Sequence, residues 1–351
     1  MRSWALNLSL PLLAAALAFA AIVHAQDYNN NGGRVRPPRD CSTTLTGDTV
    51  GVLGSGVTAT PSGDVLVGES RAGCVVRFGP DAVGHIVIGH GRRTDACPGC
   101  GVRLERPGDI EVGPDGTVYV VDLGAGQVIA VPPNGNWRVV ATAGQAFDAS
   151  PRALAQDSQG RIYVAGAGRV YRLDPSGPVV LAGGGGGDVG PGAPATSVRL
   201  TRVNAIALGP GGNLYILEAE NYRVLRVDPA GTITVFAGTG LDGDTGDGGP
   251  ATSATLDPDG LAADDAGNVY ISVQFQHRVR RVDPAGQIST FAGRGRTGSA
   301  GDGGSAALAA IGYPSDLAFR NGNLYIFDSG LPPRVRKVDR TGIITTVVAG
   351  R

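Results

Sequence analysis

The chain has 351 residues, with 57 Gly, 23 Pro and a net charge of -1. A charge this well balanced produces no large electrostatic field, which disfavours binding to nucleic acid or to an anionic membrane surface. The many Gly and Pro residues indicate numerous tight turns. Because the Gly clusters separate runs of Val, Ile, Leu and Tyr at regular spacing, they favour a folded repeat over disorder.

The first residues are predicted to lie outside the fold. An apolar run over residues 8–23 ends in the small-residue cleavage pattern Val23-His24-Ala25, which predicts a signal peptide over 1–25 and a mature start near Gln26. The run is shorter than the roughly 20 residues needed to span a bilayer, and no later run is long enough. We therefore expect a secreted or periplasmic protein without a membrane span in the mature chain. The Asn-rich, then Pro- and Arg-rich stretch 26–46 is predicted to be a flexible linker, followed by one domain over 47–351.

The chain contains four cysteines, Cys41, Cys74, Cys97 and Cys100. In a secreted protein they predict two disulfides, with three connectivities open. Cys97-Pro-Gly-Cys100 has the spacing of a redox motif but lacks a βαβ context, so a structural pair is favoured there.

An internal repeat dominates the rest of the sequence. Residues 226–271 recur in register 55 residues later, at 281–326. The clearest element is a strand after a Gly turn, present in six copies: 63–69, 116–122, 160–166, 212–218, 267–273 and 322–328. A short apolar strand precedes each copy, a strand that combines Arg with apolar residues follows it, and a fourth strand ends in variants of VFAG. Four antiparallel strands in each of six copies predict an all-β, six-bladed β-propeller.

The two ends of the domain suggest how the ring closes. The chain ends on a complete fourth strand at 342–350, yet residues 47–56 also read as a fourth strand. We expect this N-terminal strand to join the last blade.

Three motifs carry a family resemblance. The YxxD strand end, the RVxRVDxxG strand and the AGTGxxGDGGPATxAxLxxP linker resemble NHL repeats, especially those of secreted bacterial propellers, over about residues 48–351. The resemblance implies the propeller fold. It implies no single function, because the family includes lyases, lactonase-like relatives, receptor sensor domains and scaffolds.

A four-stranded blade places its loops on two faces. We call the face that holds the linkers between blades and the hairpins between second and third strands the long-loop face. The long linkers 89–107, 183–201, 238–258 and 293–314 are expected there, where variable loops on a rigid scaffold usually bind ligands. Gln274, Phe275 and His277 are binding candidates, because their hairpin replaces the usual polar loop with an aromatic residue.

Acidic residues at strand ends provide a second set of candidates. Glu69, Asp122, Glu218 and Asp328 occupy equivalent positions, and a ring of carboxylates is able to hold Ca²⁺. The favoured alternative is that each acid caps its own hairpin, as the resemblance to the repeat Asp of the family also implies.

Two other metal patterns are weaker. The loop 241–249 contains Asp242, Asp244 and Asp247, but their spacing does not match an EF-hand, and capping of the next helical turn by Asp is favoured. A zinc triad of His residues is disfavoured, because His85 falls within an outer strand.

We expect a secreted, non-catalytic binding module or scaffold, a monomer that holds a protein, glycan or small-molecule ligand on the long-loop face. The alternative is a metal-dependent lyase or lactonase-like hydrolase with its site at the central channel mouth. A structural envelope protein is a third class. No catalytic residue is assigned, and Ca²⁺ is the one cofactor candidate.

Overall fold

The computed structural model describes residues 56–70, 72–89, 97, 99–144 and 150–350. These residues belong to one compact unit. The predicted signal peptide, the linker and nearly all of the N-terminal strand at 47–56 lie outside the described residues. Within the described part of the chain, no helix is long and apolar enough to cross a membrane.

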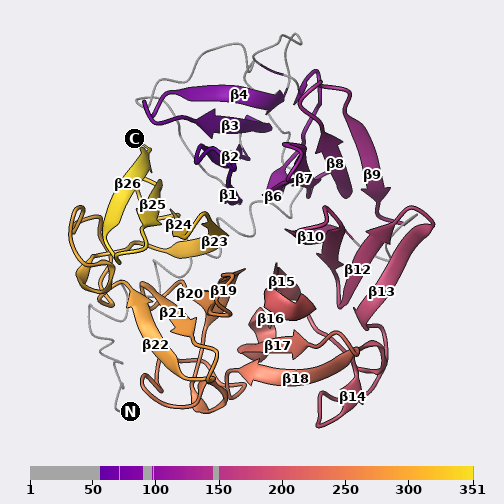
Figure 1. Cartoon of the computed structure of the whole chain (residues 1–351), viewed down its shortest axis with the longest axis vertical. Helices are drawn as coiled ribbons and strands as arrows, with labels where there is room; N and C mark the ends of the chain where they lie inside the picture. The colour runs from indigo at the N-terminus through magenta and orange to yellow at the C-terminus, as the bar shows by residue number, and fades with distance from the viewer. Residues whose placement is uncertain (1–55, 71, 90–96, 98, 145–149, 351) are drawn as a thin grey trace, which may run out of the picture. The chain divides into compact units, whose positions relative to one another are not determined.

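Six antiparallel sheets surround a common axis, which confirms the predicted six-bladed β-propeller (Figure 1). Each blade is built from four strands that follow one another in sequence, and the first of them lies innermost. Blade 1 contains β1 (Val57–Ala59), β2 (Val65–Glu69), β3 (Cys74–Phe78) and β4 (Gly84–Gly89). Blade 2 contains β6 (Pro107–Val112), β7 (Val118–Asp122), β8 (Gln127–Val131) and β9 (Arg138–Thr142). Blade 3 contains β10 (Pro151–Gln156), β11 (Ile162–Gly166), β12 (Arg169–Asp174) and β13 (Gly177–Gly183).

The remaining blades repeat this order. Blade 4 contains β15 (Val203–Leu208), β16 (Leu214–Glu218), β17 (Arg223–Val227) and β18 (Thr232–Ala237). Blade 5 contains β19 (Pro258–Ala263), β20 (Val269–Val273), β21 (Arg278–Val282) and β22 (Ile288–Ala292). Blade 6 contains β23 (Pro314–Arg320), β24 (Asn323–Asp328), β25 (Arg334–Val338) and β26 (Ile344–Ala349). Two-residue strands β5 (Gly99–Cys100) and β14 (Ala193–Pro194) extend the sheets of blades 1 and 4. The short 3-10 helices are η1 (Ala195–Ser197), η2 (Pro210–Gly212), η3 (Ala219–Asn221), η4 (Ala251–Ser253) and η5 (Ala306–Leu308).

The hydrophobic core lies between successive blades. Ile216 and Leu225 of blade 4 pack in one cluster with residues of blade 3, whereas Leu217 and Val224 pack in another with residues of blade 5. A second strand is therefore covered on both faces, and β16 is buried along its whole length. This explains why the six repeated strands read as continuous apolar runs rather than alternating ones.

Ring closure brings the inner strand of blade 6 against that of blade 1. The backbone N–H of Val57 donates to Asp316 Oδ2 at 2.7 Å, and Arg320 Nε donates to the carbonyl of Ala59 at 3.2 Å. Blade 6 already has four strands of its own, and its outer strand β26 confirms the predicted C-terminal strand. Phe327, Val335 and Val348 of blade 6 also pack in one apolar cluster with residues of blade 1, so among the described residues closure combines contacts between inner strands with burial further out.

Three long linkers depart from the expectation that they form loops on the long-loop face. Each linker runs to the outer strand of the next blade and pairs with the residues where that strand begins: Ala193 with Ile233, Pro250 with Gln287, and Ser305 with Ile343. Each linker then packs apolar side chains into the cluster between the two blades: Ala195, Val198 and Leu200; Ala251, Ala254 and Leu256; Ala306, Ala309 and Ile311. These linkers are straps, and burial of their apolar residues draws them away from the ligand-accessible face.

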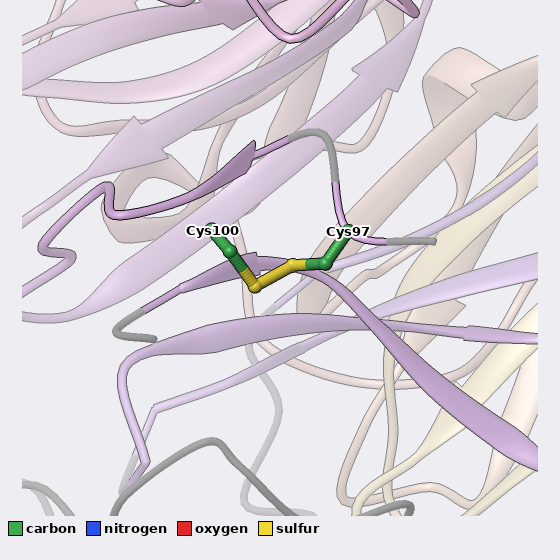
Figure 2. The surroundings of a disulfide bond; sticks show 2 residues. All are labelled: Cys97 and Cys100. Atoms are coloured by element: carbon green, nitrogen blue, oxygen red, sulfur yellow. A yellow bond between two sulfur atoms is a disulfide. The ribbon is translucent and has the colours of Figure 1, made fainter. Parts of the chain in front are cut away.

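Cys97 and Cys100 form a disulfide, and Cys100 belongs to β5, which pairs in parallel with β4 (Figure 2). This agrees with the structural pair favoured from the sequence. Cys74 is buried in β3, and Cys41 lies outside the described residues. If two disulfides form, the second therefore joins Cys41 to Cys74, which stays a prediction.

Titration of the denatured, unreduced protein with a thiol reagent is expected to find no reactive cysteine, because an oxidising compartment favours two bonds. Reduction of the denatured protein should make all four reactive. Four thiols without reduction would contradict the oxidised state.

Candidate functional site

The four acids considered as a calcium ring end the second strands of their blades, and all four side chains are buried: Glu69, Asp122, Glu218 and Asp328. Glu69, Asp122 and Asp328 accept N–H groups of their own hairpins, as the hairpin-capping alternative supposes, whereas Glu218 accepts bonds from Thr201 in the preceding linker and from the Arg223 side chain. The described residues contain no group of three or more His, Cys, Asp or Glu side chains able to hold a metal ion. The structure therefore does not bring these four acids together.

These acids do more than cap a hairpin. Asp122 accepts the N–H groups of Gly124 at 3.1 Å and Ala125 at 3.3 Å from its own hairpin. It also accepts those of Glu105 at 2.9 Å and Arg106 at 3.0 Å from the linker that enters the inner strand. One carboxylate thus fixes both segments of the long-loop face in blade 2.

Blade 6 repeats the arrangement. Asp328 accepts the N–H groups of Gly312 at 2.9 Å, Tyr313 at 2.8 Å and Gly330 at 3.1 Å. Arg334 Nε lies 3.6 Å from its second oxygen. The acid therefore anchors the residues that lead into β23.

The acids of the Asp- and Gly-rich linkers bind arginine. Arg280 has a fully buried side chain, and it donates to Asp244 at 3.1 Å and to Asp247 at 2.7 Å. Arg336, equally buried, donates to Asp302 at 2.8 Å. The prediction that Asp caps the following helical turn is wrong, because η4 has no side-chain cap; the buried guanidinium attracts these carboxylates instead.

An aromatic cluster consists of Phe275 and His277 in the hairpin of blade 5 and Tyr313, which immediately precedes β23 of blade 6. Phe275 is 45% exposed, and its ring centroid lies 6.3 Å from that of Tyr313. The His277 ring lies 5.1 Å from Tyr313, and its Nδ1 donates to the carbonyl of Gly312. The structure thus places two of the three predicted binding residues together on the long-loop face. Gln274 is half-buried beside them.

His85, which the sequence analysis considered for a zinc site, is not part of this aromatic cluster. His85 is exposed on the outer strand β4, as expected, beside a surface cavity of about 470 Å³.

The sequence did not point to the acids on the inner strands, which are half-buried. Asp109 accepts the N–H of Leu154 in the next blade at 2.7 Å, as Asp316 accepts that of Val57. Burial raises the pKa of Asp109 to about 6, and burial together with the charge of Asp109 raises the pKa of Asp316 well above its usual value. The charge of Asp109 in blade 2 thus acts on Asp316 in blade 6.

An acid and an arginine lie further along the same strands. Arg320 Nη2 donates to the carbonyl of Val112 at 2.6 Å while its Nε contacts Ala59, so its side chain joins the inner strands of blades 6, 1 and 2. Burial and the charge of Asp109 raise the pKa of Glu111 to about 8, against the opposing effect of Arg320. Ionisable groups are therefore concentrated around the axis, and burial favours the uncharged form of the acids among them.

Polar residues gather where the inner strands begin because most of these strands open with a bulge. The register shifts near Arg152, Asn204, Asp259 and Ser315, and between Pro107 and Ile110. A bulge adds a residue and redirects side chains, often next to binding sites. We call this region of the long-loop face the axial mouth. The sequence signal for these polar residues was their position beside a recurring Pro, as in Arg106-Pro107 and Pro151-Arg152.

Solved structures with the same fold include proteins of different functions. A protein of unknown function from Bacteroides thetaiotaomicron matches with a TM-score of 0.62 and 19% identity, over 84% of this chain and 70% of that one. An auxiliary nutrient binding protein from the same species matches with a TM-score of 0.59 and 15% identity, over 86% and 69%. Virginiamycin B lyase from Staphylococcus aureus matches with a TM-score of 0.54 and 16% identity, over 87% of each chain. No family model matches the chain, so these similarities establish the propeller fold and not the NHL family.

Proposed function

We propose that the protein is an extracytoplasmic, non-catalytic binding module that holds a ligand at the axial mouth of the long-loop face. The observation that carries this proposal is the exposed Phe275 beside Tyr313 and His277 on a rigid hairpin. Aromatic rings supply contact area at little entropic cost, and they are held here by the anchors already described. The straps and strand-end acids, by contrast, have partners within the scaffold.

Two observations support an extracytoplasmic location. The Cys97–Cys100 disulfide is typical of an oxidising compartment. A fold relative is a nutrient binding protein, which fits a ligand taken up outside the cytoplasm. The same proposal includes cleavage of the signal peptide after Ala25 and assignment of the six blades to the NHL repeats.

The proposal is tested by screening a panel of glycans and small metabolites for a shift in melting temperature, first with the wild-type protein and then with Phe275→Ala. Loss of an exposed aromatic contact is expected to weaken binding about tenfold or more. The matched control is Trp137→Ala, because Trp137 is 44% exposed but precedes the outer strand β9.

Retention of binding by Trp137→Ala together with its loss in Phe275→Ala supports the proposal. Equal binding by both variants would place the ligand elsewhere. Chemical conversion of a bound panel member would instead support the lyase or hydrolase alternative.

A further inference from the structure

Three arginines lie within two residues of where successive inner strands begin, at the axial mouth. Arg106 immediately precedes β6, Arg152 is the second residue of β10, and Arg202 immediately precedes β15. These inner strands belong to successive blades and pack side by side, as Figure 1 shows. Because each strand starts at the long-loop face, the three side chains begin on the same side of the axis.

The backbone that carries these arginines is held in place. Arg106 is fixed through its N–H by Asp122 and through its carbonyl by the N–H of Leu123, at 2.8 Å. Next to Arg202, Thr201 donates its N–H to Glu218 at 2.7 Å. The strand-end acids therefore preorganise the residues from which the guanidinium groups extend, which lowers the entropic cost of binding.

Their guanidinium groups differ from those of three arginines that open third strands on the same face. Arg223, Arg278 and Arg334 each lie beside a carboxylate, those of Glu218, Asp244 and Asp328. Within the described part of the chain, the side chains of Arg106, Arg152 and Arg202 form no ion pair and no hydrogen bond. Arg152 and Arg202 are exposed, whereas Arg106 has a buried Nε without a hydrogen-bond partner.

The three charges also repel one another. The pKa of Arg152 is lowered by partial burial of its guanidinium group and by the positive charges of Arg202 and Arg106, with a smaller opposing effect from Glu220. Like charges held together without a paired counter-charge destabilise a protein, and such arrangements are frequent at functional sites. A bound anion would remove this repulsion.

We infer that Arg106, Arg152 and Arg202 form a binding site for an oxyanion, the carboxylate or phosphate group of a small ligand. Guanidinium groups present planar pairs of donors that match both groups, and such charge-assisted bonds are the strongest hydrogen bonds in proteins. This inference rests on the proposed binding function and assigns its ligand class.

The test uses isothermal titration calorimetry of the full mature protein with inorganic phosphate, glucuronate and glucose. Phosphate or glucuronate is expected to bind, with the tighter of the two identifying the source of the oxyanion, and glucose is expected to bind more weakly. Arg152→Gln and Arg202→Gln should each weaken oxyanion binding about tenfold or more. Added salt should weaken it in the wild-type protein as well.

Arg296→Gln is the matched control, because it removes one positive charge from an exposed residue of the 293–314 linker. It should change the affinity by no more than about twofold, since distant surface charges are screened. Melting temperatures measured without ligand check folding, and neither mouth variant should be less stable than the wild-type protein.

Failure of both oxyanions to bind, or equal affinities of Arg152→Gln, Arg202→Gln and Arg296→Gln, would overturn the inference. If a neutral glycan binds in a manner that depends on Phe275, the binding function stands and only the oxyanion assignment fails. If no member of either panel binds, the proposed function fails with it.

Discussion

Replacement of Asp328 by Ala is expected to lower the free energy of unfolding by about 3 to 4 kcal/mol. The wild-type carboxylate is fully buried and accepts three backbone N–H groups, from Gly312, Tyr313 and Gly330. Alanine leaves these donors without their acceptor and Arg334 without its nearby charge. Urea denaturation at neutral pH, monitored by circular dichroism, measures the loss.

Asp283→Ala is the matched control for this prediction. Asp283 also caps a hairpin, where it accepts the N–H of Gln287 at 2.9 Å, but this turn is exposed to water. Its loss should cost only about 1 kcal/mol, because water replaces the carboxylate. Equal losses in the two variants would contradict the anchoring role of Asp328. Stabilisation of the wild-type protein but not of Asp328→Ala by Ca²⁺ would instead support the calcium hypothesis.

The sequence predicted the blades because their determinants are local. The Asp-Pro-Ala-Gly turns at Asp228 and Asp283 form through a side chain that accepts a hydrogen bond four residues later, and their glycines have φ near +80°. Strands on either side of such a turn must pair with each other. The six copies of the strand that follows a Gly turn then determined the number of blades.

The straps were not predicted because their partners belong to the next repeat. Nothing within residues 238–258 indicates that Pro250 pairs with Gln287. A signal was nevertheless present: Ala251, Ala254 and Leu256 correspond to Ala306, Ala309 and Ile311, and this recurring apolar pattern lies within otherwise polar linkers. Apolar residues that recur in a supposed loop indicate burial.

The axial arginines show a second reason why part of the candidate site could not be predicted from the sequence. Arg106, Arg152 and Arg202 lie 46 and 50 residues apart in the sequence, and they meet only because the ring places successive inner strands together. The strand-end acids were considered as metal ligands because carboxylates bind metals, yet in the fold these carboxylates accept hydrogen bonds from backbone N–H groups. The direction of a side chain relative to the axis depends on bulges such as that at Arg152, which periodicity does not reveal.

The free energy of unfolding is expected to fall as the pH rises from about 5 to about 8. Burial raises the pKa of Glu111 to about 8 and those of Asp109 and Asp259 to about 6, from ordinary values of 4.5 and 3.8. Between those limits the native chain holds protons that the unfolded chain has released. Unfolding then releases protons, so each increase in pH favours the unfolded state. Turn acids with a lowered pKa, such as Asp339 beside Thr341, act oppositely and destabilise the protein at lower pH.

The variant Glu111→Gln measures how much Glu111 contributes to this pH dependence of the free energy of unfolding. The substitution removes the ionisable group while keeping its size. It should raise the free energy of unfolding at pH 8 by about 1 to 2 kcal/mol, a value that is reduced because water reaches the axis. At pH 5 the free energy of unfolding should change little. Glu105→Gln is the control, because Glu105 is exposed and its change should have little effect at either pH. Urea denaturation of the three proteins at both pH values measures the difference. If Glu111→Gln instead destabilises the protein at pH 8, Glu111 is ionised in the native state and paired with Arg320, and the axis is held by that ion pair rather than weakened by a buried acid.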